Sequence, residues 1–272
     1  MSQLKVNVIR HTSASSDAIE LATDGTCTAK ITNNLSNRNL IINGSCIVAQ
    51  RSTSSTTSGY GSVDRFKVAF SGTDEAITHS QVAVASGTTP YTSGFRKALK
   101  LTNGNQTSGA GTGDDVKIEY GIEAQDIANS GWNYTSASSY ITLSFWVKSS
   151  VAQNFYGYIQ THDGTGQRYP FETGSLSADT WTKITKTISG NSNITVDDNN
   201  EKGLTIVISQ FIGTNMTAST SLNTWAAWDS AVRTPDQTST WYTTNDATFE
   251  ITGVQLEVGD FASDYSHEPY SE

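Results

Sequence analysis

Hydrophobic and polar residues alternate along most of the chain in short runs that polar turns separate. Alternation with a period of two is typical of a β-strand that buries one face. In the clearest run, ITLSFWVKS, Ile141, Leu143, Phe145 and Val147 share one face, and Trp146 lies on the other. We therefore expect strands at residues 39–50, 63–70, 97–102, 116–123, 140–149, 154–160, 180–189, 203–212 and 247–258.

The helical period of 3.6 residues is not sustained beyond a turn or two anywhere in the chain, and a short helix is expected only within residues 122–130. In the last expected strand the pair Thr252-Gly253 interrupts the alternation, which predicts a β-bulge. The pattern therefore predicts an all-β protein whose sandwich domain spans residues 39–272.

Residues 1–38 differ from the rest of the chain. Alternation is present around Val6 and Val8, but no aromatic residue occurs before Tyr60. Such a segment has little large apolar surface with which to build a core of its own. We expect an N-terminal β arm that serves attachment or oligomerisation, and the alternative is that it supplies the first two strands of the main domain.

Composition and charge exclude several classes of function. The chain of 272 residues has a net charge of −9 and lacks the basic surface that nucleic acid binding requires. Its apolar runs are too short to cross a bilayer, and its start lacks the apolar core of a signal peptide. We therefore expect synthesis in the cytoplasm and no membrane insertion. The two cysteines, Cys27 and Cys46, form neither a disulfide framework nor a metal motif, so two buried thiols are expected.

Catalytic and metal motifs are not apparent. Glycosidases need two carboxyl groups facing each other across a cleft, about 5–9 Å apart, and adjacent residues such as Asp114 and Asp115 rarely meet that geometry. The turn TVDDNNEKG could offer Ca²⁺ the carboxylates of Asp197, Asp198 and Glu201, but it lacks EF-hand spacing, and a solvated turn is the alternative. We expect no enzymatic activity and no cofactor other than a possible structural Ca²⁺.

Four aromatic residues make the strongest candidate binding site. Trp225, Trp228, Trp241 and Tyr242 lie in the long connection between residues 213 and 247. Connections of such length are uncommon and are often functional. These rings would either stack on sugar rings, or pack against the fold or a neighbouring subunit.

Several separated motifs resemble those of bacteriophage virion and tail-fibre proteins. They are NLIINGSCIVAQRSTS followed by GYGSVDRF, then SFWVKSS, and finally ITGVQLEVG, in the same order as in that family. The last two are also similar to strands of jelly-roll carbohydrate-binding modules. The resemblance covers about residues 39–272 and departs at the end, where YSHEP replaces the usual FEHR.

This resemblance implies a jelly-roll β-sandwich and a place in the virion, assembled in the host cytoplasm. The implied function is that of a non-enzymatic structural protein of a tailed phage, a tail-fibre or adhesin module that recognises a host-surface glycan. Decoration of the capsid or a head fibre, a free carbohydrate-binding module and a polysaccharide-degrading enzyme are the alternatives. The implied partners are other virion proteins through the N-terminal arm, two further copies in a homotrimer, and host surface polysaccharide.

Overall fold

The computed structural model describes residues 6–15, 17–21, 23, 25, 27–29, 39–265 and 267. The chain divides into two compact units, residues 1–36 with 263–266 and residues 37–262 with 267–272. The expected boundary between residues 38 and 39 stays a prediction, because residues 30–38 lie outside the described part.

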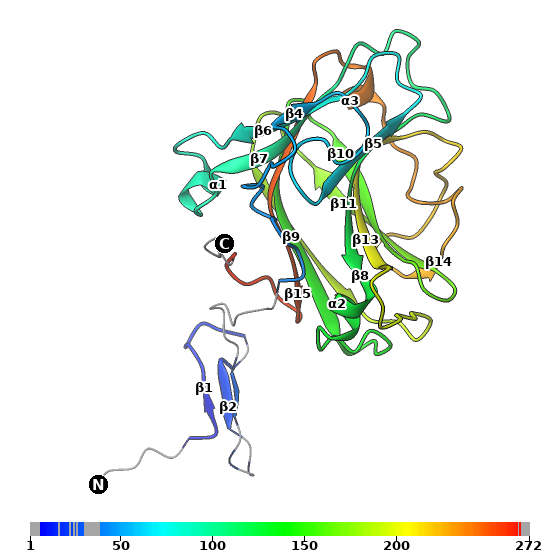
Figure 1. Ribbon diagram of the computed structural model, residues 1–272. Helices are drawn as coiled ribbons and strands as arrows, with labels where there is room; N and C mark the ends of the chain where they lie inside the picture. Colours follow the sequence, from blue (N-terminus) through cyan, green and yellow to red (C-terminus); the bar gives the residue numbers. More distant parts are fainter. Residues whose placement is uncertain are drawn as a thin grey trace. The chain divides into compact units, whose positions relative to one another are not determined.

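Two six-stranded antiparallel sheets form the larger unit (Figure 1). The first, called the β13 sheet, has the order β14 (Ala226–Ala227), β11 (Gln167–Ser175), β10 (Asn154–Thr161), β13 (Lys202–Ile212), β8 (Asp115–Glu123) and β5 (Phe66–Ser71). The second, called the β9 sheet, has the order β12 (Thr182–Ser189), β9 (Tyr140–Ser149), β15 (Thr248–Val258), β7 (Lys97–Thr102), β6 (Thr78–Ala83) and β4 (Ser54–Ser55).

The path of the chain is that of a jelly roll. From β7 to β10 each successive strand belongs to the opposite sheet, and β11, β12 and β13 alternate in the same way. Connections of this kind join two sheets into one sandwich. The predicted all-β jelly-roll sandwich is therefore confirmed.

The core lies between the two sheets and is rich in phenylalanine. Phe155 of β10 and Phe249 of β15 meet edge to face with ring centroids 5.0 Å apart. Phe145 of β9 and Phe171 of β11 are also completely buried. The inward residues of β9 are those that the alternation predicts, and the sheet buries that face because apolar area removed from water stabilises the fold.

The predicted helix and the predicted bulge are both present. Helix α2 (Ala124–Ala128) lies within residues 122–130. The pairing of β15 with β9 shifts register between Thr252 and Gln255, where Gly253 has a positive φ of 65°. Two more single-turn helices, α1 (Thr89–Thr92) and α3 (Thr240–Thr243), lie in connections.

The strand prediction fails in several places: β4, β6, β11 and β14 were not predicted, and one expected strand is absent. Two of these failures have a clear local cause. The expected strand over residues 39–50 is wrong: Asn43 and Cys46 have positive φ, and the Asn43 side chain bonds to the backbone of Val48. Strand β11 was not predicted, because Pro170 argues against a strand interior. Pro170 pairs with Tyr158 of β10, and its carbonyl accepts from the Asn223 N–H on the opposite side. Its nitrogen therefore faces the sheet edge, where β14 pairs only with Gln167 and Arg168 and needs no donor from the proline.

The N-terminal unit contains a small antiparallel sheet of β1 (Val8–Ile9), β2 (Ile19–Leu21) and β3 (Cys27–Ala29). Four of the eight large apolar side chains that the described part of the chain exposes lie here, namely Val6, Val8, Ile9 and Leu21. Sheets with such short strands need apolar cover to be stable. No helix in the described part of the chain combines the length and the apolar character needed to cross a membrane.

Candidate functional site

The four candidate aromatic residues occupy three different environments. Trp241 and Tyr242 of α3 are completely buried in the core of the sandwich. Trp241 donates its indole Nε1–H to the carbonyl of Thr248 at 3.1 Å, and Tyr242 stacks on Phe211 with ring centroids 4.6 Å apart. Packing, which is the alternative to sugar contact, therefore describes both residues in this structure.

Side-chain hydrogen bonds with Asn103 and Asp114 hold helix α3 in place. The side chain of Asn103, itself buried, donates to the carbonyls of Tyr242 and Thr244. The Tyr242 hydroxyl donates to Asp114 Oδ2 at 3.1 Å. Burial, together with this hydrogen bond, raises the pKa of the Tyr242 hydroxyl above its ordinary value, so Tyr242 remains a neutral donor.

Trp228 lies on the face of the β13 sheet that points away from the β9 sheet, called the outer face below. Its ring is 5.8 Å from that of Tyr158 and is half-buried. Tyr158 forms a small apolar cluster, separate from the main core, with Val207 and Ile212. The 213–247 connection therefore covers part of the outer face and pins Trp228 against it.

Trp225 borders a cavity. Its indole Nε1–H donates to the carbonyl of Ser189 at 2.7 Å, and its ring packs 5.2 Å from that of Tyr169. These contacts hold the indole at one orientation, with 9% of the residue exposed. A tryptophan fixed in this way offers a rigid ring face to a ligand at little cost in conformational entropy.

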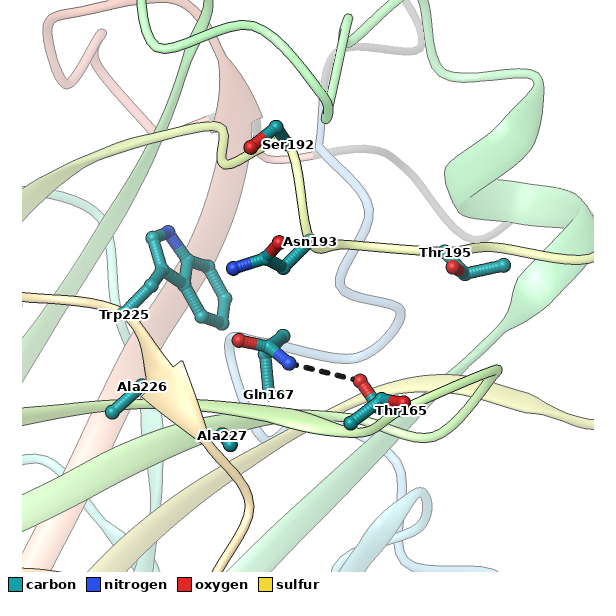
Figure 2. Close-up of a pocket in the computed structure, with 8 residues that line it drawn as sticks. All are labelled: Thr165, Gln167, Ser192, Asn193, Thr195, Trp225, Ala226 and Ala227. Atoms are coloured by element: carbon teal, nitrogen blue, oxygen red, sulfur yellow. Dashed lines mark hydrogen bonds between the residues drawn. The ribbon is translucent and has the colours of Figure 1, made fainter.

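The cavity beside Trp225 has a volume of about 420 Å³, which lies within the range of about 300–1,000 Å³ found for small-ligand pockets. It lies between the β11–β14 edge of the β13 sheet and the turn that follows β12 (Figure 2). Its lining residues are Thr165, Gln167, Ser192, Asn193, Thr195, Trp225, Ala226 and Ala227. None of these eight side chains carries a charge.

Two amides turn toward the indole inside this cavity. Gln167 donates its Nε2–H to the carbonyl of Thr165 at 2.9 Å, which leaves its oxygen on the side of Trp225 (Figure 2). Asn193 is exposed, and Figure 2 shows its amide beside the indole ring. One aromatic face with amides and hydroxyls around it can hold a pyranose ring, whose apolar side lies on the indole while its hydroxyls form hydrogen bonds.

Sequence reasoning located Trp225 but missed the residues that face it. Gln167 begins β11, which was not predicted, and Ser192 and Asn193 belong to a polar turn. Polar turn residues occur throughout this chain and carry no periodic signal, so nothing in the sequence distinguishes these from the rest. The signal for Trp225 was the length of the connection that contains it.

The calcium hypothesis finds no support among the described residues, which contain no group of three His, Cys, Asp or Glu side chains arranged to hold a metal ion. Asp198 instead accepts a hydrogen bond from the Asn129 amide at 3.1 Å. In the same segment the Asp197 N–H donates to Asp163 Oδ2 and the Glu201 N–H donates to Asn199 Oδ1, both at 2.9 Å.

The other pair of adjacent carboxylates points to separate partners. Asp114 accepts hydrogen bonds from the Gly111 N–H and from Tyr242. Asp115 pairs with Lys117 and accepts a hydrogen bond from the Ser71 hydroxyl.

No protein-family model and no curated protein sequence matches the chain. Among solved structures, it is similar to the enzymatically active domain of tailspike protein 4 of bacteriophage CBA120, with 12% identity and a TM-score of 0.40 over 81% of this chain and 21% of the tailspike chain. It is also similar to the N-terminal cellulose-binding domain of Cellulomonas fimi β-1,4-glucanase C, with 10% identity and a TM-score of 0.37 over 78% and 98%.

A third similar structure is the family 11 carbohydrate-binding module of Clostridium thermocellum in complex with a β-1,3-1,4-mixed-linked tetrasaccharide, with 11% identity and a TM-score of 0.34 over 75% and 95%. The chain spans only 21% of the tailspike chain, and 28% of a further similar structure, the CBM22-1–GH10 modules of Clostridium thermocellum endo-1,4-β-D-xylanase 10B. With TM-scores below 0.5, these similarities do not assign a ligand to this chain.

Proposed function

We propose that this chain is a non-enzymatic structural module of a tailed-phage particle that recognises a host-surface glycan through the cavity beside Trp225. The observation that carries the glycan part is the rigid indole face with uncharged amides and hydroxyls around it. Charged catalytic groups are not among the lining residues, which favours binding over hydrolysis. The place in the virion rests on the resemblance of the sequence motifs to phage fibre proteins.

The N-terminal sheet supports attachment as the second part of the proposal. Val8, Ile9 and Leu21 are 41%, 51% and 41% exposed on strands too short to form a core alone. Exposed apolar side chains gathered on one small element mark an interaction surface. We propose that this arm joins other virion proteins and assembles the module as a homotrimer, as the resemblance implies.

Replacing residues of the cavity tests the glycan part. Asn193→Ala removes an exposed amide, and Trp225→Phe keeps an aromatic ring but not the indole bond to Ser189. We expect each variant to weaken binding on a host-glycan array, and Trp225→Ala to weaken it at least about tenfold, as is typical of a central aromatic contact.

Trp181→Ala is the matched control, because Trp181 is a half-buried tryptophan that does not line the cavity. Equal loss of binding in Trp181→Ala and Asn193→Ala would contradict the assignment of this cavity. Circular dichroism and thermal unfolding of each variant separate lost binding from lost folding.

Immunogold labelling of purified particles tests the place in the virion. With antibody raised against residues 39–272, we expect gold at the tail or its fibres in electron micrographs. Gold spread over the head would make the chain a decoration or head-fibre protein. Particles without gold, from a preparation in which the antibody detects the free chain, would refute the virion assignment.

A further inference from the structure

Arg168 is a buried cation without a counter-ion. It lies on β11, on the outer face of the β13 sheet, paired with Gln160 on one side and Ala226 on the other. Only 6% of the residue is exposed. Its single hydrogen bond runs from Nη1 to the Thr220 hydroxyl at 2.9 Å, and its buried Nε has no partner.

No carboxylate lies within ion-pair distance of this guanidinium in the described part of the chain, whose five ion pairs all involve other cations. Burial lowers the pKa of Arg168, and Asp229 opposes that shift only from a greater distance. Removing a charge from water without a partner is unfavourable, so such groups are normally paired. An unpaired arginine in a chain of net charge −9 therefore calls for an explanation.

A second arginine lies on the same outer face. The Arg233 guanidinium is 5.9 Å from the centre of the Trp228 ring, and its Nε–H donates to the carbonyl of Ser230. Trp228 is two residues beyond Ala226, the residue paired with Arg168. Burial raises the pKa of the Tyr158 hydroxyl, and the charge of Arg233 and a hydrogen bond from it oppose this larger effect by lowering that pKa. Trp228 packs against the ring of the same tyrosine.

Two acidic groups on this face, Glu119 and Asp115, are engaged by lysines, and the exposed Asp229 lies beyond ion-pair distance of Arg168. Glu119 pairs with Lys67 and Lys117, and Asp115 also pairs with Lys117. Neither carboxylate forms an ion pair with Arg168 or Arg233 in the described structure. The surface around Trp228 therefore presents two arginines that form no ion pair among the described residues, and the buried Nε of Arg168 has no hydrogen-bond partner.

The geometry of the free donors indicates what would bind. The hydrogen bond to Thr220 engages Nη1, so Nε and Nη2 remain together on one edge of the guanidinium. Two parallel N–H groups on one edge match the two oxygens of a carboxylate or phosphate. The Nε atom is buried, so binding at this edge includes a shift of the side chains that cover it.

We infer that Arg168, with Arg233 and Trp228 beside it, binds an anionic group carried by the glycan that occupies the cavity beside Trp225. Gln167 lines that cavity and Arg168 follows it on the opposite face of β11, while Ala226 and Ala227 of β14 form the edge between them. A glycan chain that crosses this edge would place a neutral unit on Trp225 and an acidic unit at Arg168. The inference rests on the proposed function and assigns its ligand to the acidic glycans.

Titration of the full-length protein, labelled with ¹⁵N, tests the inference through the Nε–H resonance of Arg168, assigned with the Arg168→Lys variant. The probes are sodium glucuronate, inorganic phosphate and glucose at equal ionic strength. We expect glucuronate to shift the Arg168 resonance saturably and glucose to leave it unchanged. A saturable shift with phosphate alone would identify a phosphate-bearing glycan as the source of the anion.

Arg233→Gln is the second variant, because the half-buried Arg233 can be changed with less risk to the fold than Arg168. We expect it to weaken the glucuronate or phosphate response at least threefold. The inference is overturned if neither anion produces a saturable shift, or if glucose produces the same one. A glycan that needs Trp225 for binding but leaves Arg168 unshifted would refute this inference and leave the proposed function standing.

Discussion

Replacing Trp241 by alanine is expected to lower the free energy of unfolding by about 3–5 kcal/mol, the usual cost of removing a large aromatic ring from a core. Trp241 is among the largest side chains that are completely buried, and it lies on a helix of only four residues, α3. The variant would also leave the Thr248 carbonyl without its indole donor. Urea unfolding with an unchanged m-value measures the loss directly.

Trp228→Ala is the control from the same connection. Trp228 is half-buried and packs on the Tyr158 ring outside the main core, so its removal should cost no more than about 1–2 kcal/mol. Comparable stability losses in the two variants would contradict the placement of Trp241. A Trp241→Ala protein that unfolds like the parent protein but no longer binds glycan would make Trp241 a ligand contact after all.

The contrast between these tryptophans shows why composition alone did not define the site. In the sequence Trp225, Trp228, Trp241 and Tyr242 are equivalent, since all four follow β13 in a stretch without a regular period. Their environments depend on how the connection returns to the sandwich. Only the formation of β14 beside β11 brings Trp225 to the cavity, and a pairing of two residues leaves no recognisable pattern.

The main strands were predictable because they obey a local rule. Strand β9 alternates strictly, and Ile141, Leu143, Phe145 and Val147 are all completely buried as expected. The opposite face of β9 is not exposed as alternation predicts, because Thr142 and Ser144 are also almost fully buried. Thr142 donates its hydroxyl to the carbonyl of Gly259, so the segment after β15 covers part of this face.

Two of the failures arise where individual side chains outside the alternating pattern determine the backbone conformation. NLIING reads as an apolar strand, but the Asn43 amide donates to the carbonyls of Val48 and Asp64 and closes a loop. Gln167, which lines the neutral cavity, and Arg168, the buried cation, both lie on β11, a strand that was not predicted because it contains Pro170. The same departure from the strand rule thus hid both the neutral cavity and the buried cation from sequence reasoning.

Replacing Gly157 by alanine is the second change with a large expected effect, because this glycine leaves room for the core that supports the site. Gly157 lies on β10, between β11 and β13. A Cβ atom added there would lie 2.5 Å from the Phe171 ring and 2.5 Å from the backbone oxygen of Val207. The backbone atom cannot move aside without breaking the β10–β13 pairing, so we expect a loss of about 1–3 kcal/mol from overpacking.

Gly121→Ala is the matched control, since Gly121 lies on β8 of the same sheet and an added Cβ would meet only the flexible Lys202 side chain at 3.6 Å. We expect this variant to be neutral, or more stable by about 0.4–1 kcal/mol because alanine restricts the unfolded chain. Thermal unfolding of both variants, followed by binding to a positive glycan from the array, separates the two effects. If Gly157→Ala matched Gly121→Ala in stability, Phe171 would be free to move, and the packing that positions β11 and its two binding faces would be looser than the structure shows.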